Sequence, residues 1–246
     1  MSGRDKESYN IRSVENALHL LEALAHDGER CSLAELSQRL DMTKASLFRL
    51  MATFENMGYV ERGPRSGEYK LGMAAFETSQ KLLSRMSLLR KARPVMAQLA
   101  RQCDETVYLV VRRDDDALFL EMADTDQKVN VVPLTSQRFP LGDCAPGRLL
   151  KAFSTTPPQP RNPADSRIYQ QRYCLDHDGL GDGSSSLAVP LFQQGQQLAG
   201  SLTIVAPTFR MDGHRVANEL LPALKAAGDM ISARLGYNLY GSRGAT

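Results

Sequence analysis

Cys174, Asp176 and His177 lie close together in the sequence and carry the side chains of a thiol nucleophile and its base. Neighbouring side chains on an extended segment alternate sides, so this spacing does not by itself bring the thiol to the imidazole. Catalytic cysteine and histidine residues usually come from segments that are distant in sequence. The sequence also contains no GxSxG or HExxH motif and no glycine-rich phosphate loop. We therefore expect that the protein is not an enzyme.

The sequence predicts neither a metal site nor a cofactor. Its four cysteines, Cys31, Cys103, Cys144 and Cys174, form no CxxC pair, which is the spacing of zinc knuckles and dithiol redox sites. We expect these thiols to be reduced and mostly buried. The acidic run 114–116 could bind calcium, but no glutamate follows at the spacing of a calcium loop, which favours a solvated turn.

The segment from Lys44 to Asn56 has the composition of a helix that fits into a DNA groove. Helical periodicity separates an apolar side from an outward side, which bears Ala45, Phe48, Arg49, Ala52 and Asn56, flanked by Lys44, Ser46 and Thr53. Alanines allow close approach, Arg49 and Ser46 can donate to bases or phosphates, and Phe48 can contact a methyl group. Farther along, Arg62, Arg65 and Lys70 suit phosphate contacts.

Charge and composition leave alternatives open for this segment. Residues 39–70 hold six basic and four acidic residues, and the whole chain holds 30 against 28. An ordinary surface helix, or a module that binds protein rather than DNA, has the same pattern.

The composition of the whole chain limits the class of protein. An apolar fraction of 42% and a charged fraction of 24% exclude predominant disorder. The longest apolar stretches are too short to cross a bilayer and the start has no signal-peptide core, so we expect a cytoplasmic protein without a membrane partner.

Three helices and two strands are predicted to position these side chains. Ser13 can cap a helix that ends near Gly28, and Ser32 with Glu35 has the spacing of a capping box for a second helix. After a break at 41–43, a third helix runs to Gly58, and residues 59–72 give two short strands. This order matches a winged helix-turn-helix. The expected buried stripes are Val14, Ala17, Leu18, Leu21, Leu24 and Ala25 in the first helix, and Leu47, Leu50, Met51, Phe54 and Met57 in the third.

The remaining sequence predicts a linker and an α+β domain with one antiparallel sheet. Residues 73–91 form a polar helical stretch, which we interpret as a linker, and Pro94 fits the first turn of a further helix to about Gln102. From residue 105 the pattern changes to strands, with hairpins at 106–123 and 187–205 and another strand at 129–134. A short helix follows 140–145, then comes a proline-rich surface loop at 154–165, and a last helix spans roughly 215–237.

Along nearly its whole length the sequence resembles the IclR family of bacterial transcriptional regulators. The matching stretches are SVENALHLLEALA, SLAELSQRLDMTKASLFRLMATFENMGYVER, GEYKLG, ARPVMAQLARQCDETVYLVV, LGDCAPGRLLKAF and LAVPLFQQGQQLAGSLTIVAP. The resemblance implies a winged helix-turn-helix DNA-binding domain at 1–72, a linker helix at 73–91 and a GAF- or PAS-like effector-binding domain at 92–246. It also implies homodimers, or dimers of dimers, on pseudo-palindromic double-stranded DNA operators, with Lys44, Ser46 and Arg49 at the DNA.

The resemblance further implies a small-molecule effector, often a carboxylate, bound between the sheet and a helix N-terminus. The matching positions are Val131, Ala145, Pro146, Gly147, Asp176, Ser186, Thr203 and Val205. Amides at a helix start hold anions, but Pro146 has no N–H, and Val205 stands where the family commonly has a serine. We therefore expect an organic acid or aromatic compound that is less purely ionic than a two-carbon or three-carbon acid. The function expected is a transcriptional regulator controlled by this effector; a ligand-binding or protein-interaction module that does not act on DNA is the alternative.

Overall fold

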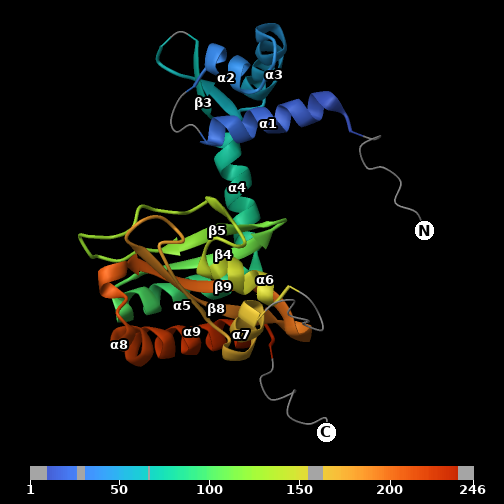
Figure 1. The fold of residues 1–246 in the computed structure, drawn as a ribbon. Helices are drawn as coiled ribbons and strands as arrows, with labels where there is room; N and C mark the ends of the chain where they lie inside the picture. Colours follow the sequence, from blue (N-terminus) through green and yellow to red (C-terminus); the bar gives the residue numbers. More distant parts are fainter. Residues whose placement is uncertain (1–9, 27–30, 66, 155–162, 238–246) are drawn as a thin grey trace. The chain divides into compact units, whose positions relative to one another are not determined.

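A computed structural model describes residues 10–26, 31–65, 67–154 and 163–237 of the chain (Figure 1). The chain divides into two compact units, Met1–Arg85 and Met86–Thr246. The first unit is mainly helical with a small sheet, and the second has a six-stranded sheet covered by helices. In the described ranges, no helix is long and apolar enough to cross a membrane.

The first unit is a winged helix-turn-helix, as predicted. Helices α1 (Arg12–His26), α2 (Leu33–Arg39) and α3 (Lys44–Asn56) pack around one apolar core, beside a sheet of strands in the order β1-β3-β2. The capping box is confirmed, because the Ser32 hydroxyl accepts from the Glu35 amide at 3.2 Å and the Glu35 carboxylate accepts from the Ser32 amide at 2.8 Å. Strands β2 (Val60–Arg62) and β3 (Glu68–Leu71) form the predicted hairpin, and β1 (Cys31–Ser32) adds an unpredicted third strand.

Two residues, Thr43 and Gly58, fix the two ends of α3. The Thr43 hydroxyl accepts from the Ser46 amide at 3.2 Å and so caps the start of the helix. Gly58 follows the last turn with a φ of +76°, a conformation that glycine adopts without the steric cost of a side chain. The predicted end of the helix at this glycine is therefore confirmed.

The predicted buried stripe of α1 is mostly wrong: of its six residues only Leu24 is buried, Ala17 and Leu21 are half-buried, and Val14, Leu18 and Ala25 are exposed. Leu20, Ala23 and Leu24 are buried, whereas Val14 and Leu18 are 53% and 56% exposed. The buried face is therefore turned around the helix relative to the predicted stripe, because periodicity gives the spacing of apolar residues but not which side of the helix packs on its neighbours. Met57, expected in the stripe of α3, is also exposed. The predicted end of α1 near Gly28 lies outside the described residues.

The helical stretch predicted at 73–91 is interrupted. Helix α4 (Met73–Arg85) ends before Met86, which has extended backbone angles, and α5 (Ser87–Cys103) begins directly after it. Pro94 lies inside α5 rather than in the first turn of a new helix. Both Arg90 and Pro94 are exposed, so water can satisfy the carbonyl that the proline leaves without a partner.

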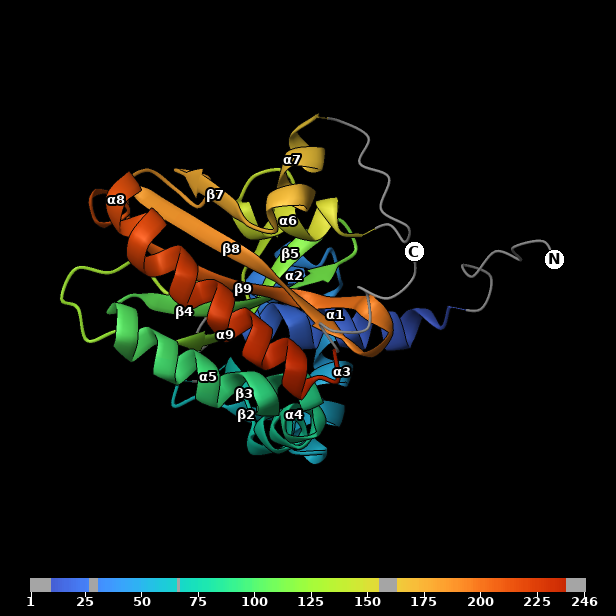
Figure 2. The same ribbon diagram turned by 90° about the horizontal axis from the view of Figure 1, so that it is seen from below.

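The second unit is built on an antiparallel sheet in the order β6-β5-β4-β9-β8-β7, with β6 (Arg138–Pro140) and β7 (Cys174–His177) at its edges. The predicted hairpins are confirmed as β4 (Thr106–Arg113) with β5 (Asp116–Ala123), and β8 (Ser184–Gln193) with β9 (Gln197–Pro207). Figures 1 and 2 show α5 and α9 (Leu221–Arg234) along one face of this sheet, and α6 (Ala145–Ala152) with α7 (Pro163–Gln171) at the other. Because strand side chains alternate, Tyr108, Val110 and Val205 pack with Cys144 and Leu150 on the α6 face.

Several details of the second unit differ from the sequence prediction. The strand expected at 129–134 is wrong, since residues 124–137 form a loop between β5 and β6 (Arg138–Pro140). The last helix is divided into α8 (Gly213–Arg215), a π-helical turn (Val216–Leu220) and α9, which ends at Arg234. Helix α7 and strand β7 (Cys174–His177) were not predicted. Most of the predicted proline-rich loop, residues 155–162, lies outside the described residues.

Candidate nucleic-acid interface and ligand site

Helix α3 presents most of the predicted DNA-contacting side chains to solvent. Its orientation is fixed by Leu47 and Met51, which are fully buried in the core of the first unit. On the opposite side Phe48 is 54% exposed and Arg49 is exposed. Lys44, Ala45, Ser46, Thr53 and Asn56 are exposed as well, and Ala52 is half-buried. An exposed aromatic ring beside an arginine and small residues is suited to contacts in a major groove.

The basic side chains of the wing are already paired with carboxylates. Arg62 donates to both Glu55 oxygens, at 2.8 and 3.2 Å, and Lys70 lies 3.1 Å from a Glu61 oxygen. The hydrogen bond from Lys70 lowers the pKa of Glu61, and the hydrogen bond to Glu55 raises the pKa of Arg62. Arg65 lies 3.8 Å from Glu68. A phosphate must therefore compete with three carboxylates for these cations.

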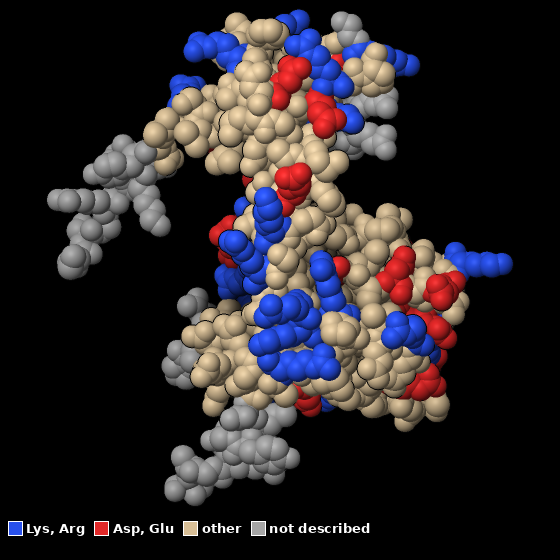
Figure 3. All heavy atoms as spheres, turned by 180° about the vertical axis from the view of Figure 1, so that it is seen from behind, with Lys and Arg blue, Asp and Glu red and all other residues tan. Residues whose placement is uncertain are grey.

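Lys44 and Arg49 differ from the wing residues, because the described residues hold no ion pair to either of them. On the face shown in Figure 3, basic and acidic side chains of the first unit lie side by side rather than in one basic patch. The charge on α3 is thus available for an incoming anion, whereas the wing has little net positive charge.

The residues expected to bind the effector share one face of the second unit. Asp176 of β7 lies opposite Ser186 of β8, and Ser186 lies opposite Val205 of β9. Thr203 lies two residues from Val205 and is fully buried. By strand alternation, these four side chains point to the face that α6 covers. Ala145, Pro146 and Gly147 form the buried first turn of α6, and Val131 packs against the same apolar cluster as Val205.

The start of α6 lies against the preceding loop. A Cβ atom on Gly147 would lie 2.8 Å from the Leu141 carbonyl oxygen, so glycine permits this close approach. Cys144 is the N-cap residue without a side-chain capping bond, and Pro146 contributes no N–H. The helix start consequently offers fewer donors to an anion than a helix with a complete set of amides.

Sequence reasoning assigned no role to two side chains of this face. Arg148, one residue after the matched helix start, forms an ion pair with Asp176 at 3.0 Å and also donates to the Gly142 carbonyl at 2.9 Å. Tyr108 is fully buried, and its hydroxyl accepts from the Leu134 amide at 3.3 Å. No sequence signal pairs Arg148 with Asp176, because the contact depends on how α6 crosses β7.

Two buried polar atoms on this face have no hydrogen-bond partner among the described residues. They are Oδ2 of Asp176 and Oγ of Ser186, which belong to side chains that face each other across β7 and β8. Burial raises the pKa of Asp176, and the charge of Arg148 and the nearby Gly179 backbone amide oppose this shift, so Ser186 is the more clearly unpaired of the two. Thr203, by contrast, shares a hydrogen bond of 3.1 Å with Ser201. An unpaired buried polar group costs about 1–3 kcal/mol, so a ligand that pairs with Asp176 and Ser186 would recover part of this cost.

The same geometry opposes a thiol enzyme at Cys174. Burial raises the pKa of the Cys174 thiol to about 12 and that of Cys144 to about 11, whereas a nucleophilic cysteine needs a lowered pKa. Cys174 and His177 are three residues apart on β7 and therefore point to opposite faces. His177 instead shares a 2.7 Å hydrogen bond with Ser185. No metal-binding group of His, Cys, Asp or Glu occurs in the described part of the chain.

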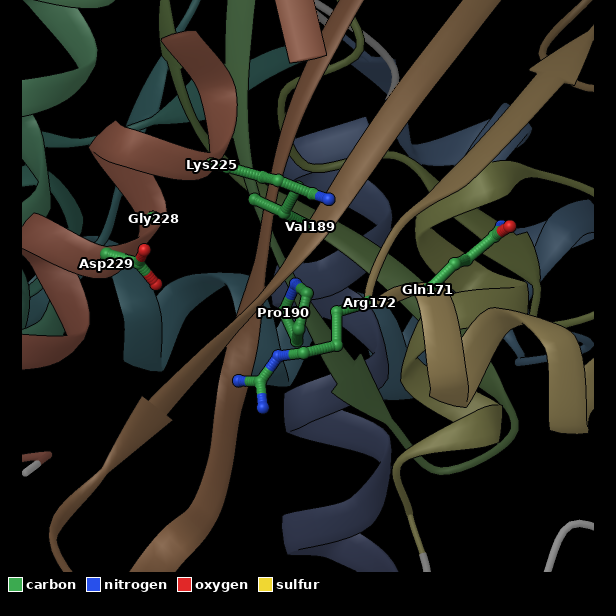
Figure 4. A pocket seen from close by; sticks show the side chains of 7 residues that line it. All are labelled: Gln171, Arg172, Val189, Pro190, Lys225, Gly228 and Asp229. Atoms are coloured by element: carbon green, nitrogen blue, oxygen red, sulfur yellow. The ribbon is translucent and has the colours of Figure 1, made fainter. Parts of the chain in front are cut away.

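A separate pocket of about 290 Å³ lies between the end of α7, strand β8 and helix α9 (Figure 4). It is lined by Gln171, Arg172, Val189, Pro190, Lys225, Gly228 and Asp229. Arg172 lies over the Phe192 ring and Lys225 over the Tyr173 ring, with distances of 4.9 and 5.0 Å to the ring centroids. None of the eight predicted effector residues lines this pocket, so it is distinct from the face under α6.

Both units match family models. Residues 13–64 match the IclR helix-turn-helix domain, and residues 80–160 and 166–233 match the bacterial transcriptional regulator IclR C-terminal domain. The chain is 27% identical over 257 residues to the HTH-type transcriptional regulator KdgR of Escherichia coli (strain K12), covering 96% of this chain and 97% of KdgR. It is also 27% identical over 248 residues to the regulator KipR of Bacillus subtilis (strain 168), covering 92% and 98%.

Solved structures share the fold. The crystal structure of an IclR transcriptional regulator from Alicyclobacillus acidocaldarius superposes with a TM-score of 0.81 at 24% identity, covering 93% of this chain and 100% of that one. An IclR homologue from Microbacterium hydrocarbonoxydans, solved in complex with 4-hydroxybenzoate, has a TM-score of 0.77 at 21% identity and covers 91% and 99%.

Proposed function

This chain belongs to the IclR family of bacterial transcriptional regulators, and we propose that its helix α3 reads the operator while the face under α6 binds the effector. It is a DNA-binding transcriptional regulator with a C-terminal effector-binding domain, and its relatives are regulators rather than enzymes. The observation that carries the proposal for DNA is the exposure of Phe48 and Arg49 on a helix whose opposite side is buried.

The proposed DNA contacts fall into two classes. Lys44, Ala45, Ser46, Phe48 and Arg49 on α3 face the bases and nearby phosphates, and Arg62, Arg65 and Lys70 of the wing contact phosphates. The wing contacts form by exchange, because each cation leaves a carboxylate in favour of a phosphate. The wing is therefore proposed to steer and orient the protein on DNA, while α3 selects the sequence.

The DNA-binding proposal is tested by the salt dependence of binding. The full chain is used to select fragments from fragmented genomic DNA, and the affinity for the best fragment is measured by fluorescence anisotropy from about 50 to 200 mM salt. If a dimer makes roughly six to ten phosphate contacts, the affinity falls by about 10³- to 10⁵-fold over this range. A protein-interaction module that does not act on DNA selects no fragment at any salt concentration, and this outcome would contradict the proposal.

The effector is proposed to be a small organic acid or aromatic compound with both polar and apolar parts. Asp176 and Ser186 supply unpaired polar atoms, and Tyr108 and Phe119, in edge-to-face contact with a centroid distance of 5.2 Å, supply an apolar aromatic wall. The missing amide of Pro146 reduces the capacity for a carboxylate at the helix start. The aromatic acid named for the Microbacterium homologue has this mixture of groups and is a suitable first trial compound.

We further propose that the protein acts as a homodimer or a dimer of dimers, through apolar side chains that the first unit leaves uncovered. Val14 and Leu18 form one exposed stripe on α1, with Ile11 exposed directly before the helix, and Met73, Phe76 and Leu82 are exposed on α4. Exposed apolar patches on a small unit mark interaction surfaces. The interrupted helical segment 73–91 is proposed to transmit the effector signal, because half-site spacing depends on how two reading helices are held.

Substituting glutamate for Leu18 is expected to weaken self-association about tenfold or more, because the change places a charge within the proposed apolar interface. Sedimentation velocity on the full chain measures this shift. Glu22→Gln, at an exposed position on the same helix, is the matched control and keeps the wild-type assembly. If Leu18→Glu sediments like the wild type, the dimer surface lies elsewhere.

A further inference from the structure

The loop of residues 124–137, here called the covering loop, lies over the apolar cluster on the α6 face of the sheet. Its residues Val131 and Leu134 pack in the cluster that contains Tyr108, Cys144 and Val205. The covering loop is irregular and partly exposed, with Val129 at 58% and Val132 at 73% exposed. Its position therefore depends on a small number of contacts with the rest of the unit.

One side chain far along the chain tethers the middle of the covering loop. Nη1 of Arg210, in the turn after β9, donates to the Val129 carbonyl at 2.8 Å. Within the described residues, this is the one hydrogen bond that joins residues 125–133 to a segment outside the loop. The next anchor is the bond from the Leu134 amide to the Tyr108 hydroxyl.

Arg210 is itself held by a buried carboxylate. The Glu105 side chain is 1% exposed and accepts from Nε and Nη2 of Arg210 at 2.8 and 2.7 Å. This bidentate pairing fixes the plane of the guanidinium, so its remaining donor points in a defined direction. Arg215 also pairs with Glu105, at 2.5 Å, but its other contacts are to the carbonyls of Cys103 and Arg210 and to the Glu219 carboxylate, and not to the covering loop.

We propose that Arg210 is a positioning residue for the face under α6. Glu105 holds Arg210, and Arg210 keeps the covering loop closed over the part of this face that bears Tyr108, Ser186 and Thr203. The pairing of Arg210 and Arg215 with one carboxylate supplies a matched control, because both arginines neutralise Glu105 and only Arg210 contacts the loop. The proposal rests on the proposed effector site for its functional meaning. The tether itself can be tested without effector or DNA.

The test compares Arg210→Gln, Arg210→Lys and Arg215→Gln in the full chain by amide hydrogen exchange. In both Arg210 variants we expect the exchange of the Leu134 amide, which donates to the Tyr108 hydroxyl at the next anchor of the covering loop, to rise about ten- to one-hundredfold, the range for losing a hydrogen bond from a charged group. Arg210→Lys retains a charge for Glu105 but cannot reproduce the planar fork that also reaches Val129. The Arg210→Lys variant therefore still tests the proposal if Arg210→Gln does not fold. Arg215→Gln is expected to leave the Leu134 amide as protected as in the wild type.

A second readout reports access to the face beneath the loop. Cys144 is fully buried in the cluster that the covering loop covers, whereas Cys174 is buried in the neighbouring cluster against α6 and α7. With iodoacetamide as the probe and peptide mass spectrometry as the detector, Cys144 should alkylate faster in both Arg210 variants, with Cys174 unchanged. Equal exchange in the Arg210 and Arg215 variants, or faster alkylation of both cysteines together, would overturn the proposal.

Discussion

Replacing Arg49 with alanine is expected to weaken operator binding by about 5- to 140-fold for each half-site, the range for losing one bidentate arginine contact to a base. Arg49 lies on the exposed side of α3, and no described ion pair competes for its guanidinium. The substitution removes no buried side chain, so the fold and the response to effector should be retained. Fluorescence anisotropy with the selected fragment measures the loss, and thermal denaturation checks the fold.

The control for this experiment is Arg101→Ala, which removes an exposed arginine from α5 of the other unit and should leave operator affinity unchanged. A base contact has a second signature, since its loss also reduces discrimination between the operator and variant sequences. A wing substitution such as Lys70→Ala should instead weaken binding to all sequences similarly and reduce the salt slope by about one. If Arg49→Ala binds the selected fragment like the wild type, α3 does not read the operator through this residue.

Local sequence signals were sufficient for most of the first unit. The Ser32–Glu35 capping box joins residues three positions apart, and Gly58 ends α3 through its own backbone conformation. Such features depend on near neighbours and can be predicted from a single sequence. The predicted buried stripe of α1 was wrong because periodicity gives the spacing of apolar residues but not which side of the helix packs in the core.

The second unit shows why long-range contacts limit such predictions. The apolar run 129–134 resembles a strand, but it pairs with no strand, and three of its backbone groups bond to side chains, with Arg210 reaching Val129 across 81 positions. Likewise, Ser186 lies opposite Asp176 only because β7 and β8 form a hairpin that the sequence did not reveal. The family resemblance named these positions, and the structure adds the unpaired atoms and the Arg148 contact.

Most substitutions of buried residues decrease the free energy of unfolding. Because the Ser186 hydroxyl is buried and unpaired, we expect its removal to have the opposite effect. Ser186→Ala should increase the free energy of unfolding of the ligand-free chain by about 1 kcal/mol or more, because it removes a buried polar atom that has no partner. The same change should reduce the stabilisation that a bound effector provides, since the ligand loses a hydrogen-bonding group. Chemical denaturation without ligand, followed by thermal shifts with 4-hydroxybenzoate and related acids, measures the two effects separately.

Ser232→Ala is the matched control, because this serine is equally buried but fully bonded. Its hydroxyl donates to the Gly228 carbonyl at 2.8 Å and accepts from the Phe192 amide at 3.1 Å. Removing it leaves the Phe192 amide unpaired and should decrease the free energy of unfolding by about 1–3 kcal/mol. A polar group kept at a cost to stability is expected at a binding site, where the ligand supplies the missing partner. If Ser186→Ala destabilises the chain as much as Ser232→Ala does, the Ser186 hydroxyl is bonded within the folded protein and its assignment to the effector site is wrong.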